Sequence, residues 1–214
     1  MSDRTALIEQ ARSLFTGPCD FVRGVAQLEQ LPDASLPEVA FIGRSNVGKS
    51  SLINALTNRK QGASALARVS NTPGRTQQLN YFNLGGAMYL VDLPGYGYAE
   101  APKNEVAAWT HLIKQFLRGR VTLQRVFLLV DSRHGLKKSD EEFLKLLDSA
   151  AVTTEIILTK TDLVKPTPLA ATAEDVKAKI KKHPAAFPEL HQVSSEKTIG
   201  IDDLRAHILE IISQ

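Results

Sequence analysis

The sequence predicts a three-layer α/β fold, in which a mostly parallel sheet with one antiparallel edge strand carries helices on both faces. Short apolar runs with the length of strands alternate with longer segments whose apolar residues recur at helical spacing. The runs 79–84 and 87–92 are joined through Gly85-Gly86, which is typical of a hairpin. The hairpin accounts for the antiparallel edge, and the alternation accounts for the parallel remainder.

The elements can be placed along the chain in order. Residues 4–15 form the first predicted helix, because their apolar side chains share helical spacing before Gly17-Pro18. Residues 21–28 fit an edge strand, and residues 31–37 fit a linker. The remaining strands are predicted at 39–42, 79–84, 87–92, 125–131, 155–159 and 190–194. The remaining helices are predicted at 49–58, 103–117, 139–150, 170–182 and 201–212.

Length and composition agree with one domain. The chain has 214 residues, of which 43% are apolar and 23% are charged, as expected for a globular protein with one sizeable core. We expect residues 37–214 to form this domain and residues 1–36 to add an N-terminal helix and linker. No stretch approaches the roughly 18 uncharged apolar residues of a membrane span, and no signal-type core follows Met1. The expected state is a cytoplasmic monomer, in which the single cysteine, Cys19, forms no internal disulfide.

A phosphate-binding loop follows the strand at 39–42. Its motif, G-x-x-x-x-G-K-S, consists of Gly43, Arg44, Ser45, Asn46, Val47, Gly48, Lys49 and Ser50. The motif joins a strand to a helix, which is the context that this loop requires. Its glycines let backbone N–H groups point inward, and the start of the helix adds positive charge. We expect Lys49 to contact phosphate and the Ser50 hydroxyl to bind Mg²⁺.

A second motif is suited to binding the terminal phosphate of a nucleotide, and such short motifs are called boxes below. It reads D-x-x-G at the end of the strand 87–92 and consists of Asp92, Leu93, Pro94 and Gly95. The carboxylate of Asp92 can hold Mg²⁺ through water, and the N–H of Gly95 can meet a terminal phosphate.

Two further boxes are suited to binding the base of a guanine nucleotide. The first, T-K-x-D, consists of Thr159, Lys160, Thr161 and Asp162. The carboxylate of Asp162 can accept both N–H donors of a guanine edge, a pair that adenine lacks. The second consists of Val193, Ser194 and Ser195, whose backbone N–H groups can reach the guanine carbonyl. All these boxes lie at strand ends on one side of the sheet, where ligands bind in α/β folds.

Basic residues are distributed unevenly. Between Glu38 and Asp92 the sequence has no acidic residue, although it has six basic ones: Arg44, Lys49, Arg59, Lys60, Arg68 and Arg75. Such a stretch favours polyanions, either the phosphates of a nucleotide or an RNA surface, and a solvated basic loop is the alternative. A second basic run on a predicted helix fits a solvated face or an RNA contact and consists of Lys177, Lys179, Lys181 and Lys182.

The boxes together resemble those of translation-factor-like GTPases, and one subgroup matches more closely. The segments T-P-G-R-T-Q at 72–77 and D-L-P-G-Y-G-Y at 92–98, with the phosphate loop, are similar to the EngB family. The resemblance covers about residues 20–214. It implies a single-domain GTPase that helps to mature the large ribosomal subunit in bacteria and whose loss disturbs cell division and septation.

Two other functions stay open beside this resemblance. A different P-loop enzyme, such as a nucleotide kinase, would bind ATP and GTP indifferently, and Asp162 argues against it. A GTP-dependent switch could instead act on a cell-division or membrane partner without binding the ribosome.

The resemblance also implies roles for the segment before residue 79. Thr76 resembles the switch threonine that binds Mg²⁺ only when the γ-phosphate is present, so Ser50 and Thr76 would be the direct protein ligands, with Asp92 acting through water. The nucleotide-binding residues that it implies in this segment are Gly74, Arg75, Thr76, Gln77 and Gln78. We expect the loop 58–78 to order on GTP and to loosen on GDP, and a loop that is mobile in every state is the alternative.

Hydrolysis is expected to be slow. Tyr96 follows D-x-x-G, where Ras-like enzymes carry a glutamine that orients the attacking water. Catalysis would rest on Lys49, Thr76, Mg²⁺ and backbone donors, with a group supplied by a partner as a further candidate and the water-positioning residue unknown. Asn46 resembles the asparagine of potassium-activated GTPases, so K⁺ is a candidate second ion.

The histidines suggest no further site in the sequence. They are scattered along the chain at positions 111, 134, 183, 191 and 207 and show no spacing typical of a metal site or a catalytic triad.

Overall fold

The computed structural model describes residues 3–59, 66, 78–97 and 103–214, with the side chains of 103–106 outside the description. Within this part the chain folds into a seven-stranded sheet with the order β1-β3-β4-β2-β5-β6-β7. The strands are β1 (Cys19–Val25), β2 (Glu38–Gly43), β3 (Leu79–Leu84), β4 (Met88–Asp92), β5 (Leu123–Asp131), β6 (Thr154–Thr159) and β7 (Ala186–Gln192). The helices are α1 (Asp3–Thr16), α2 (Lys49–Leu56), α3 (Lys103–Gly119), α4 (Lys138–Ala150), α5 (Pro166–Ile180) and α6 (Ile201–Ile212). The predicted α/β fold is therefore confirmed.

Antiparallel pairing is confined to one side of the sheet, as predicted. Strand β3 runs antiparallel to β4 and also to β1, which occupies the edge, and the other described pairs are parallel. The edge strand ends at Val25, before the predicted residue 28, because the side chain of Gln30 accepts hydrogen bonds from the N–H groups of Ala26 and Gln27. These bonds close a turn, and a short 3₁₀ helix, Leu28–Gln30, follows.

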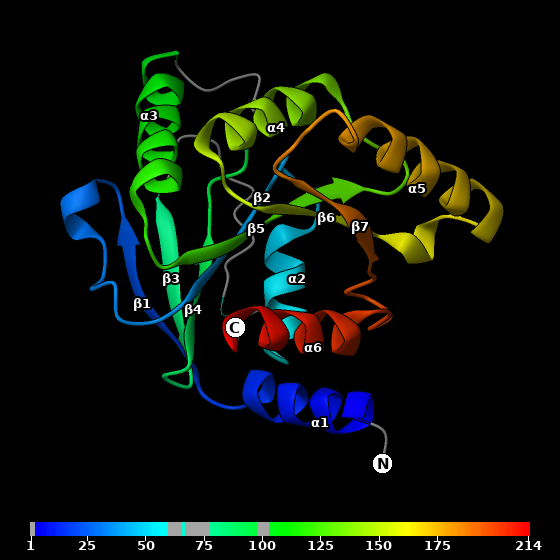
Figure 1. Cartoon of the computed structure of the whole chain (residues 1–214), viewed down its shortest axis with the longest axis horizontal. Helices are drawn as coiled ribbons and strands as arrows, with labels where there is room; N and C mark the ends of the chain where they lie inside the picture. The colour runs from blue at the N-terminus through cyan, green and yellow to red at the C-terminus, as the bar shows by residue number, and fades with distance from the viewer. Residues whose placement is uncertain (1–2, 60–65, 67–77, 98–102) are drawn as a thin grey trace.

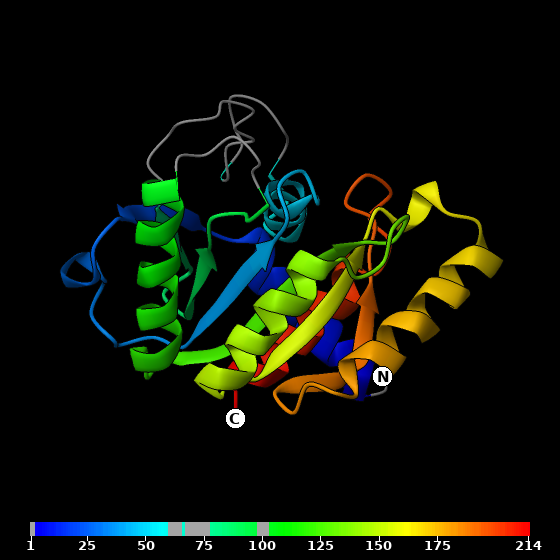
Figure 2. The same ribbon diagram turned by 90° about the horizontal axis from the view of Figure 1, so that it is seen from above.

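Helices cover both faces of the sheet (Figures 1 and 2). Alternate residues of the central strands point to opposite faces, so Ala40 and Ile42 of β2 pack toward α3, α4 and α5, whereas Val39 and Phe41 pack toward α2 and α6. All four side chains are fully buried. The strands therefore read as continuous apolar runs in the sequence, as expected for a sheet that is covered on both sides.

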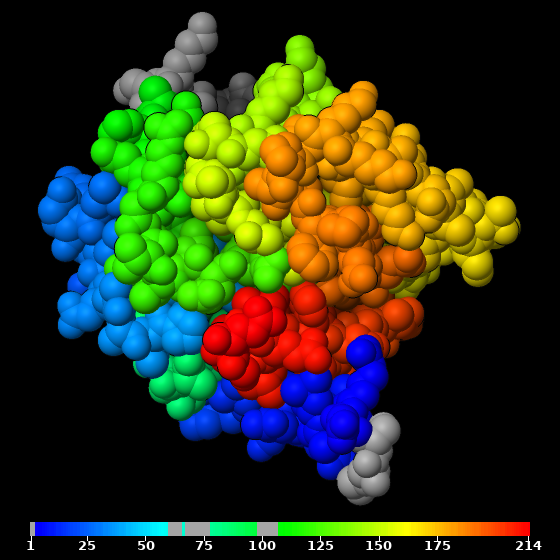
Figure 3. All heavy atoms as spheres, viewed as in Figure 1, coloured from blue at the N-terminus to red at the C-terminus, as the bar shows by residue number. Residues whose placement is uncertain are grey.

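The N-terminal helix α1 packs on the C-terminal helix α6 (Figures 1 and 3). Ala11 of α1 is buried against Ala206 and Leu209 of α6. Two ion pairs flank this contact, Arg4–Asp203 at 2.7 Å and Arg12–Asp202 at 2.5 Å. The division of the chain at residue 36 stays a prediction, and both α1 and β1 pack on elements beyond that point.

None of the helices in the described residues combines the length and the apolar character needed to cross a membrane.

Cys19 at the start of β1 is fully buried in the core. Burial raises the pKa of its thiol to about 11, so almost none of it is thiolate near neutral pH. We expect the folded protein to react negligibly with Ellman's reagent at pH 8, and the urea-unfolded protein to release one equivalent of thionitrobenzoate. Rapid stoichiometric labelling of the folded protein would contradict this placement of Cys19.

Candidate functional site

The phosphate-loop motif lies where the sequence predicts it, between β2 and α2. Strand β2 is central, since it pairs with β4 on one side and β5 on the other. The chain leaves β2 toward one half of the sheet and later returns to the other half through β5. The loop from Gly43 to Ser50 therefore occupies a topological switch point at the carboxyl edge, which is the usual ligand position in open α/β sheets.

Two glycines set the path of this loop. Gly48 has φ of 103° and forms the N-cap of α2, a conformation that residues with a Cβ rarely adopt. A Cβ at Gly43 would lie 2.8 Å from the carbonyl oxygen of Leu129 and 2.9 Å from Val47 Cγ1. The loop therefore begins against β5 and ends with the first N–H groups of α2 available to an anion.

Lys49 and Asp92 meet at the centre of the candidate site. Asp92 ends β4 and lies opposite Phe41 of β2 in the parallel register, so it sits beside the phosphate loop. The ammonium of Lys49 donates a hydrogen bond to Asp92 Oδ1, and both side chains are largely buried. Ser50 lies in the first turn of α2, one residue after Lys49. The hydroxyl of Ser50 and the carboxylate of Asp92 are hard oxygen donors, which is the ligand chemistry that suits Mg²⁺.

The D-x-x-G segment runs along the phosphate loop. The backbone N–H of Ser45 donates to the carbonyl of Tyr96 at 3.1 Å, and the N–H of Tyr96 donates to the carbonyl of Gly43 at 3.2 Å. A Cβ at Gly95 would approach the carbonyl oxygen of Gly43 to 3.3 Å. Backbone contacts thus hold the end of β4 beside the loop, with Leu93 buried beneath it.

Tyr96 points into the core. Its ring stacks on Phe143 of α4 with centroids 5.0 Å apart, and its hydroxyl donates to Asp140 Oδ1 at 2.7 Å. Burial, with the Asp140 carboxylate adding to it, raises the pKa of Tyr96 above its usual range. Asp140 is fully buried and also accepts a hydrogen bond from the N–H of Lys137 at 2.8 Å. The ring of Tyr96 is therefore engaged in packing, and its hydroxyl is engaged with Asp140.

Asp140 also binds the phosphate loop itself. Arg44 Nε lies 3.3 Å from Asp140 Oδ2, so one carboxylate pairs with Arg44 and with the hydroxyl of Tyr96. The sequence places Asp140 in a predicted helix among other acidic residues, and it gives no signal that this one is buried. The burial of Asp140 becomes apparent from the contact of α4 with the segments that carry Arg44 and Tyr96.

Replacement of Tyr96 by Phe is expected to lower the free energy of unfolding by about 1.5–3 kcal/mol, because it removes a hydrogen bond to a buried carboxylate. Urea unfolding followed by circular dichroism measures this loss. Tyr89→Phe is the matched control, since the Tyr89 hydroxyl makes no hydrogen bond with the described residues. A loss no larger than that of the control would contradict the role given to Tyr96.

The T-K-x-D box is anchored to the phosphate loop. Thr159 Oγ1 donates to the carbonyl of Val47 at 2.7 Å, and Lys160 Nζ donates to the carbonyl of Asn46 at 2.7 Å. Lys160 has a left-handed backbone, with φ of 58°, and it precedes the 3₁₀ helix Thr161–Leu163 that carries Asp162. Two boxes that are more than 100 residues apart in the sequence therefore form one surface.

Asp131 at the end of β5 belongs to this surface and was not predicted from the sequence. Lys160 Nζ lies 3.1 Å from Asp131 Oδ2, and Arg133 pairs with the same oxygen at 2.7 Å. Burial alone would raise the pKa of Asp131, but the hydrogen bonds from Arg133 and Lys160 outweigh it and hold the pKa below its usual range. The carboxylate therefore fixes Lys160, which in turn contacts the phosphate loop.

The last box forms a tight turn after β7. Val193 donates its N–H to the carbonyl of Leu158 at 2.8 Å and accepts from the N–H of Thr161 at 3.3 Å. Ser194 Oγ accepts from the N–H of Lys197 at 3.0 Å. Ser195 follows in the same turn, so the box lies directly beside the segment that carries Asp162.

The predicted switch segment is only partly described. Gly74, Arg75, Thr76 and Gln77 lie outside the described residues, as does most of the predicted loop 58–78. Gln78 is described and exposed, directly before β3, and its side chain lies against Gly24 of β1. The expectations for Thr76 stay predictions.

Half of the basic residues between positions 38 and 92 lie in the part of the chain that the structure describes. Arg44 and Lys49 are paired with Asp140 and Asp92, and the strands of this stretch are buried. Lys60, Arg68 and Arg75 lie outside the described residues. Among the described bases of the stretch, Arg59 is exposed three residues after the end of α2, and the expected contact with a polyanion stays a prediction.

Comparison with known proteins agrees with this geometry. A family model described as 50S ribosome-binding GTPase matches residues 38–160, which include the phosphate loop and D-x-x-G. A protein from Cereibacter sphaeroides described as a probable GTP-binding protein EngB is 60% identical over 197 residues, which cover 92% of this chain and 89% of the relative. The protein of the same description from Roseobacter denitrificans is 56% identical over 204 residues, which cover 95% of this chain and 93% of the relative.

The fold agrees with a solved structure as well. The crystal structure of a probable GTP-binding protein EngB superposes with a TM-score of 0.62 at 24% identity and covers 82% of this chain and 98% of that one. The sequence matches extend over nearly the whole length of both partners, and all the boxes described above meet at one edge of the sheet. The chain therefore belongs to the EngB family of GTP-binding proteins and is a GTPase.

Proposed function

We propose that this GTPase acts as a nucleotide-controlled switch in assembly of the large ribosomal subunit and is needed for normal cell division and septation. The observation that carries the proposal is the junction of the phosphate loop with the T-K-x-D box through Thr159 and Lys160. This junction supports a guanine-nucleotide site, and the family description names binding to the 50S ribosome. The γ-phosphate would control the affinity for the ribosomal precursor.

The proposed phosphate and metal contacts come from three segments. The N–H groups of residues 43–50 would surround the phosphates, with Lys49 as the charged contact. Ser50 and Thr76 would bind Mg²⁺ directly and Asp92 through water, and their oxygen donors fit this ion. When bound, Mg²⁺ neutralises charge on the β- and γ-phosphates. Lys49 already lies at Asp92, so one small movement of its ammonium would reach an anion on the loop.

The proposed base contacts come from the two later boxes. Asp162 would accept the two guanine N–H donors, while Thr159, Lys160 and Thr161 hold its segment in place. The N–H groups at Val193, Ser194 and Ser195 would contact the guanine carbonyl. The hydrogen bond between Thr161 and Val193 supports this arrangement, because it joins the two boxes directly.

The position of Tyr96 supports slow hydrolysis. Its side chain is buried against α4 and donates to Asp140, so it cannot orient a water at a γ-phosphate. We expect single-turnover hydrolysis by the isolated protein to be slower than about 10⁻² s⁻¹, far below GTPases with a full catalytic set. A rate of several per second without a partner would refute this part of the proposal.

A potassium ion at Asn46 is a separate part of the proposal. Asn46 has a left-handed backbone, with φ of 62°, and its carbonyl accepts the bond from Lys160. Hydrolysis in KCl is expected to exceed that in NaCl at equal ionic strength. Equal rates in the two salts would refute the potassium site and leave the rest of the proposal unchanged.

Sedimentation with ribosomal subunits tests the ribosome assignment. We expect the protein bound to a non-hydrolysable GTP analogue to sediment with large subunits through a sucrose cushion, and the GDP form to stay in the supernatant. Small subunits are the control for non-specific binding to RNA, which salt weakens strongly. If neither form sediments with large subunits, the ribosome assignment fails, and a cell-division or membrane partner becomes the better assignment for the same switch.

We also propose that residues 37–214 are the GTPase domain, that residues 1–36 are its N-terminal extension, and that the protein is a cytoplasmic monomer. Light scattering coupled to gel filtration tests the last point, and a mass twice that of the chain would contradict it.

A further inference from the structure

Three side chains that are far apart in the sequence form a compact cluster. Glu155 comes from β6, His191 from β7 and His207 from α6. The Nε2 atoms of His191 and His207 lie 2.6 Å and 2.7 Å from Glu155 Oε2, and the two rings are 4.7 Å apart between centroids. One ligand atom from each residue falls within 4.8 Å of the other two. The scattered histidines of the sequence are therefore partly brought together by the fold.

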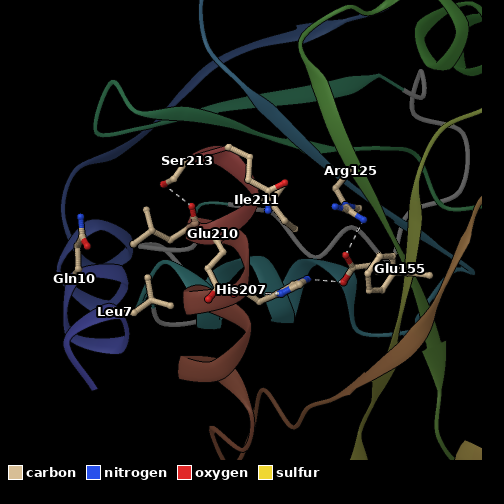
Figure 4. Close-up of a pocket in the computed structure, with 11 residues that line it drawn as sticks. Leu7, Gln10, Arg125, Glu155, His207, Glu210, Ile211 and Ser213 are labelled. Atoms are coloured by element: carbon tan, nitrogen blue, oxygen red, sulfur yellow. Dashed lines mark hydrogen bonds and ion pairs between the residues drawn. The ribbon is translucent and has the colours of Figure 1, made fainter. Parts of the chain in front are cut away.

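The cluster is separate from the nucleotide site. Glu155 is the second residue of β6, whereas Thr159, which contacts the phosphate loop, ends the same strand. Figure 4 shows Glu155 and His207 turned toward each other, beside an open cavity of about 640 Å³ between the sheet, α1 and α6. The Glu155 side chain is 1% exposed, and those of His191 and His207 are 18% and 26% exposed. The cluster thus combines a buried carboxylate with two imidazoles that solvent can reach.

We propose that Glu155, His191 and His207 bind a divalent transition-metal ion, with Zn²⁺ as the first candidate. Two imidazole nitrogens and one carboxylate oxygen are a ligand set that suits Zn²⁺, and three protein ligands leave a fourth position for water. Metal–ligand bonds of about 2.0 Å would open the two N···O contacts to about 3.3 Å, a small rotation of the exposed rings.

Metal binding displaces the hydrogen on Nε2 of each histidine ring. A carboxylate only accepts hydrogen bonds, so both rings now carry hydrogen on Nε2. When the metal binds Nε2 of a neutral ring, the hydrogen moves from Nε2 to Nδ1 of the same ring. When the ring is an imidazolium, the Nε2 proton is released to solvent and Nδ1 keeps its own. His207 Nδ1 lies 3.8 Å from Glu210 Oε2, so a small shift of either side chain would let this carboxylate accept a hydrogen bond from Nδ1–H. Metal-bound histidines commonly make such a second contact.

The remaining oxygen of Glu155 supports the same assignment. Oε1 faces Arg125 Nη1 at 3.1 Å, and it makes no hydrogen bond with the described residues. Arg125 therefore holds one oxygen and leaves Oε2, where both imidazoles converge, for the metal. The positive charge of Arg125 weakens the electrostatic attraction for a cation, and we expect micromolar affinity for this reason.

The test uses the full chain without a histidine tag, freed of metal and nucleotide, in excess Mg²⁺ to saturate sites that prefer oxygen ligands. Isothermal titration with Zn²⁺ is expected to give one site, with a dissociation constant below about 10 μM. His191→Gln and His207→Gln are each expected to weaken binding at least tenfold. His183→Gln is the matched control, because it breaks another histidine–carboxylate pair, His183–Asp148 at 2.6 Å, and should leave Zn²⁺ binding unchanged.

A measurement on the unaltered protein keeps the test decisive even if a variant fails to fold. Zn²⁺ is expected to shift the ring-nitrogen NMR signals of His191 and His207 and to leave those of His183 in place. Co²⁺ at the same site should give visible absorption that Zn²⁺ removes. The proposal is overturned if these ring signals do not move at 100 μM Zn²⁺, or if both cluster variants bind as tightly as the control.

Discussion

Replacement of Asp162 by Asn is expected to lower the affinity for GDP and GTP by about 100-fold to 10,000-fold. Each hydrogen bond between guanine and the carboxylate is worth about 1.5–3 kcal/mol, and the variant keeps an acceptor for only one of them, while the donor left unpaired costs about 1–3 kcal/mol more. The amide of asparagine would place a donor opposite a guanine donor. Xanthine carries a carbonyl in place of the guanine amino group, so the affinity for xanthine nucleotides is expected to rise.

Fluorescence titration with labelled guanine and xanthine diphosphates measures both effects. Asp175→Asn is the matched control, because Asp175 is an exposed acid on α5 that pairs with Lys179. Equal affinity of Asp162→Asn for the two bases, or an unchanged affinity for GDP, would contradict the base contact assigned to Asp162. Loss of folding would appear as a loss of affinity for both bases.

Replacement of Arg120 by Met is expected to lower the free energy of unfolding by about 3–5 kcal/mol, because it leaves a buried charge without its cation. Glu38 at the start of β2 is fully buried. Its Oε1 accepts hydrogen bonds from Arg120 Nε at 2.8 Å and from Thr122 Oγ1 at 3.0 Å, and its Oε2 accepts one from Tyr81 at 3.1 Å. The hydroxyl donors remain in the variant, but neither supplies positive charge.

Urea unfolding at pH 7 measures this loss, with Arg118→Met on the exposed side of α3 as the control. The double variant Glu38→Gln with Arg120→Met is expected to be more stable than Arg120→Met alone, since it removes the unpaired charge. A loss below about 1 kcal/mol for Arg120→Met would place this pair among ordinary surface ion pairs.

The phosphate loop, D-x-x-G and T-K-x-D were predictable because each box is a contiguous segment whose chemistry is local. Gly48 needs a left-handed backbone and Lys49 starts a helix, and neither requirement depends on distant residues. The same holds for the alternation of strands and helices. Motif and periodicity are therefore enough to place the candidate site at one edge of the sheet.

Element ends were less predictable, because tertiary pairing overrides local signals. Strand β7 begins at Ala186, four residues before the predicted start, and includes Pro188. Proline cannot donate to a sheet ladder and argues against a strand, yet β7 lies at the edge, where this costs little. Its pairing with β6 shifts register between Thr154 and Ile156, opposite the segment that contains Pro188.

The contacts missed by sequence reasoning all join distant elements. Asp131 meets Lys160 across neighbouring strand ends, Asp140 meets Tyr96 from α4, and Glu155 meets histidines 36 and 52 residues away. Each of these acids is buried, and the sequence does not distinguish a buried aspartate or glutamate from an exposed one. The three-dimensional arrangement of the elements shows which acids are buried, and the spacing of residues in the sequence does not.

The carboxylate of Asp140 has a consequence for where conformational change can begin. It binds Arg44 of the phosphate loop and Tyr96 of the segment after β4 at once, and its own helix is packed into the core. Movement of either segment away from α4 would strip a buried charge of a partner. We therefore expect the contact of Asp140 with Arg44 and Tyr96 to resist displacement more strongly than the exposed ion pairs of the fold do.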